Sequence, residues 1–414
     1  MKFKILLPSL LLFSFSLSAQ KASKTYAITG DGNNDYLWMN IRQVDLNTGK
    51  IQNTIFEKNK TAYSLTDVNS RQSVSQAAIT DANIYTNRNY PTATFVAAAA
   101  FDKRTDKLFF IPMRLNELRW IDVSNQNANA KFYSVSSSLL PISNGTDESA
   151  HITRLVIAAD GNGYGISNDG NRLVRFTTGK KPVITDLGGL IDAESNQGIS
   201  IHNKCTSWGG DMVADAYGKL WVISASHHVF EVDINSRIAT YKGAISGLPL
   251  NYTSNGAAVD DEGHIVIVSA NVFAGYYKVN FKDLTAQPIQ GSDTKYNASD
   301  LANGNLLFQK EADAARKFAI FETSDLPVAG TKVVPNPVTG NSFKVLFDGT
   351  ASGVYQIAIT DIAGRNVQTS RAALSKGQQL TTVNLINKPA NGTYFVKVLD
   401  ENGKVLMTEK IVIQ

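Results

Sequence analysis

The sequence predicts an all-β protein, with a β-propeller followed by a small C-terminal Ig-like β-sandwich. Helical periodicity is almost absent, and short apolar runs alternate with turns rich in Asp, Asn and Gly. One strand–turn–strand unit recurs at intervals close to the length of a propeller blade. Turn-forming residues then dominate positions 325–337, after which short alternating strands resume. With 414 residues, 43% of them hydrophobic, the chain is long enough for two globular domains.

The recurring unit is an apolar strand, a tight acidic or Gly turn, a second strand and then a third. Its copies lie at residues 211–233, 155–176, 257–280 and 96–122, with a weaker one at 298–322 and part of another at 25–49. Asp and Asn side chains bond their own backbone two residues on, and Gly supplies the positive φ that a tight hairpin needs.

The separation of the copies indicates the size of one blade. The equivalent turn positions are separated by 57, 55, 45 and 41 residues; they are Asp106, Gly163, Gly218, Gly263 and Gly304. A four-stranded blade takes roughly 40–50 residues. We expect six blades, with five and seven as competing counts and an elongated array of sandwiches as the alternative fold.

The N-terminus has the pattern of a secretory signal peptide over residues 1–19. Lys2 and Lys4 precede an apolar stretch at residues 5–17, and small residues precede Gln20. The apolar stretch is shorter than the roughly 20 residues that span a bilayer. No later segment is apolar enough to span one, so we expect no transmembrane segment after the signal is removed. The remaining chain divides into a cargo domain at 20–326 and a C-terminal module at 327–414.

Charge and cysteine content exclude several classes of protein. The net charge is +4, without a dense cluster of Lys and Arg, which argues against a nucleic-acid partner. The single cysteine, Cys205, excludes an internal disulfide framework and a zinc site of several cysteines.

The C-terminal module carries a series of ordered motifs. They are Pro335-Asn336-Pro337, a strand and turn that end at Gly364-Arg365, a Gly392-Thr-Tyr394 segment and a final Lys410-Ile-Val run. In this order and at the terminus, they resemble the C-terminal sorting domain of type IX secretion substrates in Bacteroidetes. The resemblance covers about a fifth of the chain.

The resemblance implies where the protein travels. A signal peptide would deliver it to the periplasm, and the type IX secretion machinery would then export it across the outer membrane. The cargo would be secreted or anchored at the outer-membrane surface. The cargo itself is similar to secreted six-bladed propellers in architecture only, because we find no family-specific motif in it.

Candidate ligand-binding residues lie directly ahead of the expected innermost strands, where propellers form a funnel. They are Arg154, Trp208, Asp211, Asn255 and Asn297. Asp211, Asn255 and Asn297 offer the oxygen ligands that a hard cation such as Ca²⁺ prefers. The same residue types are common in the turns that begin strands, so structural roles stay open.

Three short motifs have simple structural explanations. The 31–35 segment has the acidic character of a calcium loop but lacks the distal Glu, which favours a polar hairpin loop. His227 and His228 are adjacent on an extended chain and face opposite ways, which argues against one shared metal. His202 precedes Cys205 by three residues, but a Cys–His nucleophile also needs an orienting third group.

A polar insertion at residues 59–92 contains Tyr85 and Tyr90. These rings could form an aromatic binding platform or fasten the insertion to the propeller. No signature of a nucleotide-binding loop, zinc protease or serine hydrolase occurs. We therefore expect a non-enzymatic binding protein for a glycan or a surface protein. A propeller enzyme of lactonase, hydrolase or lyase type and a structural envelope component stay open.

Overall fold

A computed structural model describes residues 23–32, 34–76, 84–124, 129–140, 142, 146–315, 332–347, 352–374, 379–386 and 388–414. The predicted signal peptide lies outside them. The chain forms two compact units, residues 1–310 and 311–414. The predicted boundary at 326–327 falls among residues that are not described. Within the described residues, no helix is long and apolar enough to cross a membrane.

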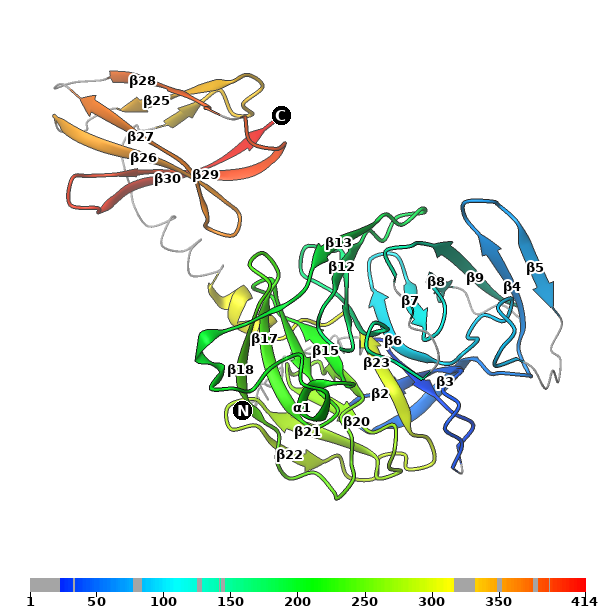
Figure 1. The fold of residues 1–414 in the computed structure, drawn as a ribbon. Helices are drawn as coiled ribbons and strands as arrows, with labels where there is room; N and C mark the ends of the chain where they lie inside the picture. The colour runs from blue at the N-terminus through cyan, green and yellow to red at the C-terminus, as the bar shows by residue number, and fades with distance from the viewer. Residues whose placement is uncertain are drawn as a thin grey trace, which may run out of the picture. The chain divides into compact units, whose positions relative to one another are not determined.

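The first unit is the predicted β-propeller, a ring of mainly antiparallel sheets. Sheet one contains β23 (Ala298–Asn303), β1 (Thr25–Thr29), β2 (Asn40–Asp45) and β3 (Lys50–Phe56). Sheet two contains β6 (Val96–Asp102), β7 (Lys107–Pro112), β8 (Glu117–Asp122), β9 (Asn129–Ser136), β4 (Ala62–Asp67) and β5 (Ser73–Gln76). Figure 1 shows β6, β15 and β23 near the centre of the ring and β3, β5, β13, β18 and β22 around its outside.

Three further sheets complete the ring. Sheet three contains β10 (Ile152–Ile157), β11 (Gly163–Ser167), β12 (Leu173–Phe176) and β13 (Ile184–Gly188). Sheet four contains β15 (Asp211–Ala214), β16 (Lys219–Ile223), β17 (His228–Asp233), β18 (Ile238–Ala244) and β14 (Ile191–Asp192). Sheet five contains β19 (Gly256–Val259), β20 (Ile265–Val268), β21 (Tyr276–Asn280) and β22 (Thr285–Pro288).

The propeller has five blades in the described residues, which corrects the expectation of six. The innermost strands contact one another in the order β23, β6, β10, β15, β19 and back to β23, which closes the ring. The two incomplete copies in the sequence, at 25–49 and 298–322, form one blade, because β23 pairs with β1. Counting them separately gives six. The part of the late copy at 318–322 lies outside the described residues.

The tight turns have the expected positive φ at Asp106, Gly218 and Gly263, but not at Gly163 or Gly304. The Oδ1 atom of Asp215 accepts the N–H groups of Tyr217 at 2.9 Å and Lys219 at 2.8 Å, and Gly218 has a φ of 86°. In the second copy the left-handed residue is Gly161, not Gly163. Gly163 lies in β11, where an added Cβ would meet the ring of Phe176 at 1.9 Å.

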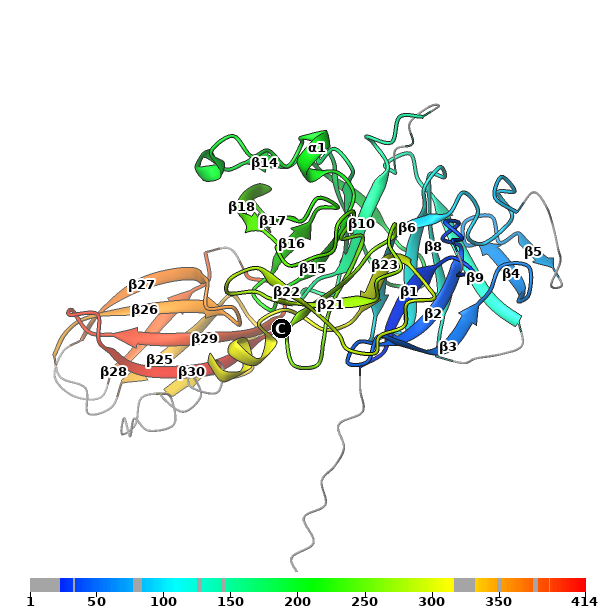
Figure 2. The same cartoon turned by 90° about the horizontal axis from the view of Figure 1, so that it is seen from below.

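The connection between β13 and β15, which leads into the fourth blade, contains three short elements. It contains β14, which pairs in parallel with β18, the 3₁₀ turn η1 (Glu194–Asn196) and the one-turn helix α1 (Lys204–Ser207). Figure 2 shows β14 and α1 beyond the edge of the fourth blade. The side chain of Asn203 caps α1 through the N–H groups of Cys205 and Thr206.

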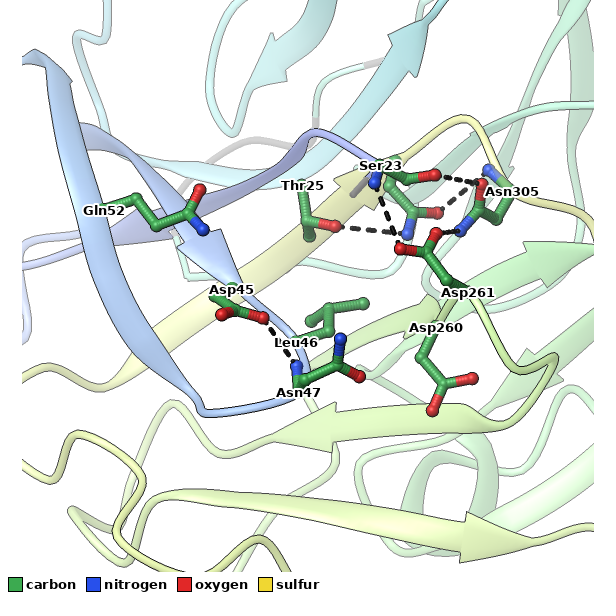
Figure 3. Close-up of a pocket in the computed structure, with 10 residues that line it drawn as sticks. Ser23, Thr25, Asp45, Leu46, Asn47, Gln52, Asp260, Asp261 and Asn305 are labelled. Atoms are coloured by element: carbon green, nitrogen blue, oxygen red, sulfur yellow. Dashed lines mark hydrogen bonds between the residues drawn. The ribbon is translucent and has the colours of Figure 1, made fainter. Parts of the chain in front are cut away.

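Polar side chains join the first and fifth blades at the face opposite the funnel. Asn303 donates to Val259 O at 2.7 Å and to Thr25 Oγ1 at 3.2 Å. Asn305 donates to Asp261 at 3.0 Å, and Asp261 accepts the N–H of Ser23. Figure 3 shows the pocket that this network borders. Its free volume is about 10 Å³, room for about one water molecule.

The second unit is the predicted small sandwich. One sheet contains β24 (Lys332–Val334), β25 (Ser342–Phe347) and β28 (Gln379–Asn384). The other contains β27 (Asn366–Leu374), β26 (Gly353–Asp361), β29 (Gly392–Leu399) and β30 (Val405–Ile413). The alternation read from residues 354–360 is confirmed, because Tyr355, Ile357 and Ile359 are buried in its core.

The ordered C-terminal motifs hold the sandwich together. The amide of Asn336 donates to Lys410 O at 2.7 Å and accepts the N–H of Val412 at 3.0 Å, which fastens the Pro-Asn-Pro segment to the last strand. Arg365 donates to Asp361 at 2.7 Å across the turn at Gly364, whose φ is 79°.

We expect Asn303→Ala to loosen the closure of the ring. The substitution removes two hydrogen bonds and leaves Val259 O without the Asn303 donor, a loss of about 1–3 kcal/mol in the free energy of unfolding. Chemical denaturation of the full chain measures this loss. Asn69→Ala, in an exposed turn, is the control. Equal midpoints for Asn303→Ala and the wild type would contradict the proposed role of the network.

Candidate functional site

The funnel face is the side of the propeller on which the five innermost strands begin. The predicted residues lie at this face or just inside it. Trp208 precedes β15 by three residues, and Asn255 and Asn297 directly precede β19 and β23. Arg154 is the third residue of β10, and Asp211 is the first of β15. The structure therefore brings these residues together at one face, as the sequence predicted. The contacts of their side chains differ from those expected of ligand-binding residues.

Arg154 is fully buried and holds the backbone of neighbouring turns. Its guanidinium donates to Ser167 O at 3.0 Å, to Gly209 O at 2.7 Å and to Ser207 O. Burial lowers its pKa to about 10, and the nearby charges of Asp211 and Asp169 oppose that shift. With its donors facing carbonyl oxygens inside the protein, Arg154 fixes the funnel wall.

Asp211 is likewise buried and accepts backbone hydrogen bonds. Its Oδ1 atom accepts the N–H of Met212 at 2.7 Å, and its Oδ2 atom accepts those of Ala257 at 2.7 Å and Leu301 at 3.4 Å. Burial raises its pKa well above the ordinary range, and these N–H groups and Arg154 partly offset that effect. Asp211 thus links β15 to β19 and β23.

The two predicted asparagines hold the same loop of the fifth blade. Asn255 Oδ1 accepts the N–H of Ala270 at 3.1 Å, and Asn297 donates to Ala270 O. Asn297 Oδ1 is buried with no hydrogen-bond partner among the described residues. Of the three predicted oxygen donors for Ca²⁺, Asn297 alone keeps an unengaged acceptor atom, and the predicted metal site stays untested.

Trp208, like Asn255, is partly exposed at this face. Its Nε1 atom donates to His202 O at 3.1 Å, and the ammonium of Lys204 lies 5.1 Å from its ring centroid. The ring therefore lies against the connection that contains α1 and is held by its own neighbours.

Three histidines of this face, His202, His227 and His228, each have a separate partner. His227 Nδ1 lies 2.9 Å from Ser254 Oγ, and His228 Nδ1 lies 3.2 Å from Tyr241 OH, so they do not face one site. Burial lowers the pKa of both rings. His202 Nδ1 lies 2.8 Å from Asp169 O.

The 31–35 segment is a polar loop closed by a lysine. Lys58 pairs with Asp31 at 2.9 Å and with Asp35 at 2.5 Å. Burial alone would raise the pKa of Asp35, but hydrogen bonds from Lys58 and from the N–H groups of Asp31 and Leu37 lower it overall. Lys58 therefore supplies the positive charge that a calcium ion would bring to a loop of this kind.

The feature that sequence reasoning missed is a line of aromatic rings across the funnel face, here called the aromatic ladder. Its members, in spatial order, are Phe273, Tyr36, Trp38, Phe95 and Tyr85. Successive ring centroids are separated by 6.0, 6.5, 5.6 and 6.0 Å. The first ring belongs to the fifth blade, the next two to the first blade and the last two to the connection ahead of β6.

The aromatic ladder is most accessible at its second ring. Tyr36 is 46% exposed, and the other four rings are partly buried. Beside it, the ring of Tyr296 lies 4.2 Å from the Arg42 guanidinium carbon and 5.1 Å from the Lys295 ammonium. The run Tyr-Leu-Trp at 36–38, apolar yet between two strands, was the signal in the sequence.

The two predicted tyrosines of the insertion take different roles. Tyr85 stacks on Phe95 as part of the aromatic ladder. Tyr90 is buried, its hydroxyl accepts the N–H of Asn59, and its ring packs against Tyr63 at 5.2 Å. Arg119 also donates to the carbonyls of residues 88, 90 and 91. Tyr90 therefore fastens the insertion to the second blade.

Comparison with known families identifies the second unit. Residues 332–414 match the family described as the secretion system C-terminal sorting domain. This match confirms the resemblance predicted from the ordered motifs. The protein is therefore secreted or attached at the outer-membrane surface. A search of curated proteins found no match to this chain.

Solved structures with some similarity include three with bacterial sources. PorZ, a surface component of the type IX secretion system of Porphyromonas gingivalis, is 13% identical with a TM-score of 0.32; the match covers 94% of this chain and 51% of PorZ. Virginiamycin B lyase from Staphylococcus aureus is 10% identical with a TM-score of 0.28; the match covers 76% of this chain and 83% of the lyase. A putative 6-phosphogluconolactonase from Bacteroides uniformis is 10% identical with a TM-score of 0.33; the match covers 88% of this chain and 100% of that protein. This chain thus spans about half the length of PorZ, and likeness at this level does not indicate a shared activity.

We expect Arg154→Ala to destabilise the propeller by about 3–5 kcal/mol, because it removes donors from buried carbonyls and the opposite charge from Asp211. Denaturant midpoints at neutral pH measure the change. Arg154→Lys should recover little of the stability that Arg154→Ala loses, since an ammonium cannot reproduce the planar set of donors. The exposed Arg71→Ala is the control. A shift as small as that of Arg71→Ala would show that Arg154 does not hold the funnel wall.

Proposed function

We propose that this exported protein is a non-enzymatic surface module that binds a glycan along the aromatic ladder of its funnel face. The observation that carries the proposal is the ladder itself: five aromatic rings from three connections, each in contact with the next. Loops on a rigid scaffold are the usual carriers of binding function.

The geometry of the aromatic ladder suits sugar rings. A pyranose has an apolar C–H face and a rim of hydroxyl groups, so it stacks on an aromatic ring and hydrogen bonds at its edges. Tyr and Trp provide large, rigid contact area together with a polar group. Tyr36 offers an exposed ring, and the exposed Lys295, whose ammonium lies 5.1 Å from the ring centroid of Tyr296, offers a donor near the same loop. Most ladder rings are already partly buried, which favours a narrow ligand over a broad protein interface.

A binding role is favoured over catalysis by the state of the polar groups. Arg154 and Asp211 are buried and bonded to backbone groups. Of the histidines of the funnel face, His151 is buried, and the other three have partners within the protein. A general base must reach the proton that it abstracts. The propeller enzyme with a funnel metal therefore has less support than a binding module.

We expect Tyr36→Ala to weaken glycan binding about tenfold, since a lost stacking contact is worth roughly 0.5–1.5 kcal/mol beyond its area. Affinity electrophoresis of the full chain against neutral and acidic bacterial and host polysaccharides identifies a ligand, and titration calorimetry gives the dissociation constant. The matched control is Tyr217→Ala, an aromatic residue that is 59% exposed on the opposite face. Equal weakening by both substitutions, or binding of a protein but of no polysaccharide, would count against the proposal.

Deletion of residues 332–414 should leave the propeller in the periplasm. The physical reason is that the sorting domain is the part that the secretion machinery recognises. Fractionation and protease accessibility on intact cells measure the location, with the full chain as control. Surface exposure of the shortened protein would show that the propeller carries an export signal of its own.

A further inference from the structure

Two carboxyl groups lie buried together in the propeller interior. Asp300, on β23, and Asp211, on β15, are both fully inaccessible to solvent. The other innermost strands leave little space around them. A Cβ added at Gly256 would approach the backbone of Asp300 to 2.9 Å. The pair is therefore enclosed by protein and has no contact with bulk water.

The two acids differ in what they touch. Asp211 accepts three backbone N–H groups, two on Oδ2 and one on Oδ1. A carboxylate has about four acceptor positions, so one position on Oδ1 is left. In contrast, the described residues offer Asp300 a single backbone donor, the N–H of Ala99 on β6, which lowers its pKa, and that contact falls short of ordinary hydrogen-bond geometry. A buried carboxylate with so few donors is costly, and such groups usually become neutral.

The charges around the pair do not balance two carboxylates. Arg154, on β10, is the cation that faces Asp211. Strand β19 contributes Gly256 and three apolar residues, and β6 contributes a run of alanines beside Asp300. The charge of Asp169 also acts on Arg154, so the guanidinium is not reserved for the pair. One guanidinium against two carboxylates leaves one negative charge in excess.

We propose that Asp300 and Asp211 share one proton in the folded propeller at neutral pH, with Asp300 as the acid that donates a hydrogen bond to the Asp211 carboxylate. No bond other than this O–H···O contact forms, and the proton comes from solvent during folding. The three buried groups are then neutral as a set. Two adjacent carboxyl groups that cannot both ionise share a proton in the same way in aspartic proteases.

The electrostatics of the pair agree with this geometry. Burial raises the pKa of Asp300 well above its ordinary value, and the neighbouring charge of Asp211 raises it further. The geometric link between the two is the N–H of Leu301, the residue after Asp300, which donates to Asp211 Oδ2 at 3.4 Å and so places the Asp211 carboxyl against β23 beside Asp300. A divalent cation fits less well. It would leave a buried excess of one positive charge, and Ca²⁺ takes 6–8 oxygen ligands whereas these two side chains keep few free positions.

The shared proton makes propeller stability depend on pH, with a defined sign. An unfolded Asp has a pKa of about 3.9. Between that value and the raised pKa of the folded pair, the folded protein holds one more proton than the unfolded chain. The contribution of the pair to the free energy of unfolding is therefore fully present below about pH 4. It decreases as the pH rises from there toward the raised pKa of the folded pair. The unfolding equilibrium constant should rise about tenfold per pH unit from this group alone.

The test compares denaturant unfolding of the full chain and of Asp300→Asn between pH 5 and 9. The amide stays neutral and can donate to Asp211, so the ratio of the two unfolding constants should change by up to tenfold per pH unit. Asp233→Asn is the control, because Lys219 and nearby donors lower the pKa of Asp233 to about 2 and its titration lies below this range. Parallel curves for the wild type and Asp300→Asn would overturn the proposal.

Two direct measurements complete the test. The infrared spectrum of the wild-type protein at pH 7 should contain the carbonyl band of a protonated carboxyl, and Asp300→Asn should remove it. If that variant fails to fold, the band in the wild type decides, and its absence would overturn the proposal. The second measurement is elemental mass spectrometry of the purified protein, together with denaturant unfolding in the presence of EDTA. A stoichiometric metal, with a midpoint that EDTA lowers, would show that a metal ion and not a proton lies between the acids.

Discussion

The pairing of β1 with β23 is the constraint on which the propeller depends. A single blade cannot bury both of its faces, so each sheet needs a neighbour on either side. Here the first blade takes its innermost strand from the far end of the unit and its other three strands from the beginning. Loop closure over such a separation costs entropy that later contacts must offset. Hydrogen bonds at the seam, among them those of Asn303, add to the backbone pairing.

Closure of the ring also determines what the funnel face can do. It brings polar side chains from several blades into one interior, where they must satisfy one another and nearby backbone groups. Arg154 and Asp211 do so by bonding to the backbone of adjacent blades. The residues left for a ligand are those on the connections, and among these the aromatic ladder is the continuous feature.

The sorting domain shows a different relation between motif and structure. Its motifs look like recognition sequences, yet in the structure several of them have mechanical roles. Asn336 fastens an entering segment to the last strand, and Asp361 with Arg365 closes a turn. Part of what makes the motifs recognisable is therefore the need to fold a sandwich of this size around one core.

Local patterns in the sequence determined the all-β class, the recurring strand–turn–strand unit of the blades, the alternation of the C-terminal strands and the nature of the sorting domain. These properties depend on neighbours in the chain: a strand alternates with a period of two, and Asp215 bonds the backbone of its own turn. The sequence also placed the five funnel residues at one face, because innermost strands all begin there.

Only the tertiary structure decided the number of blades, the roles of the polar residues and the existence of the aromatic ladder. Two incomplete repeats count as one blade only when β23 pairs with β1, and no local pattern records that pairing. The ladder joins residues 36 and 273, and the acid pair joins residues 211 and 300. Contacts between residues so distant in the chain depend on how the ring closes, since that closure alone brings the first, fourth and fifth blades together.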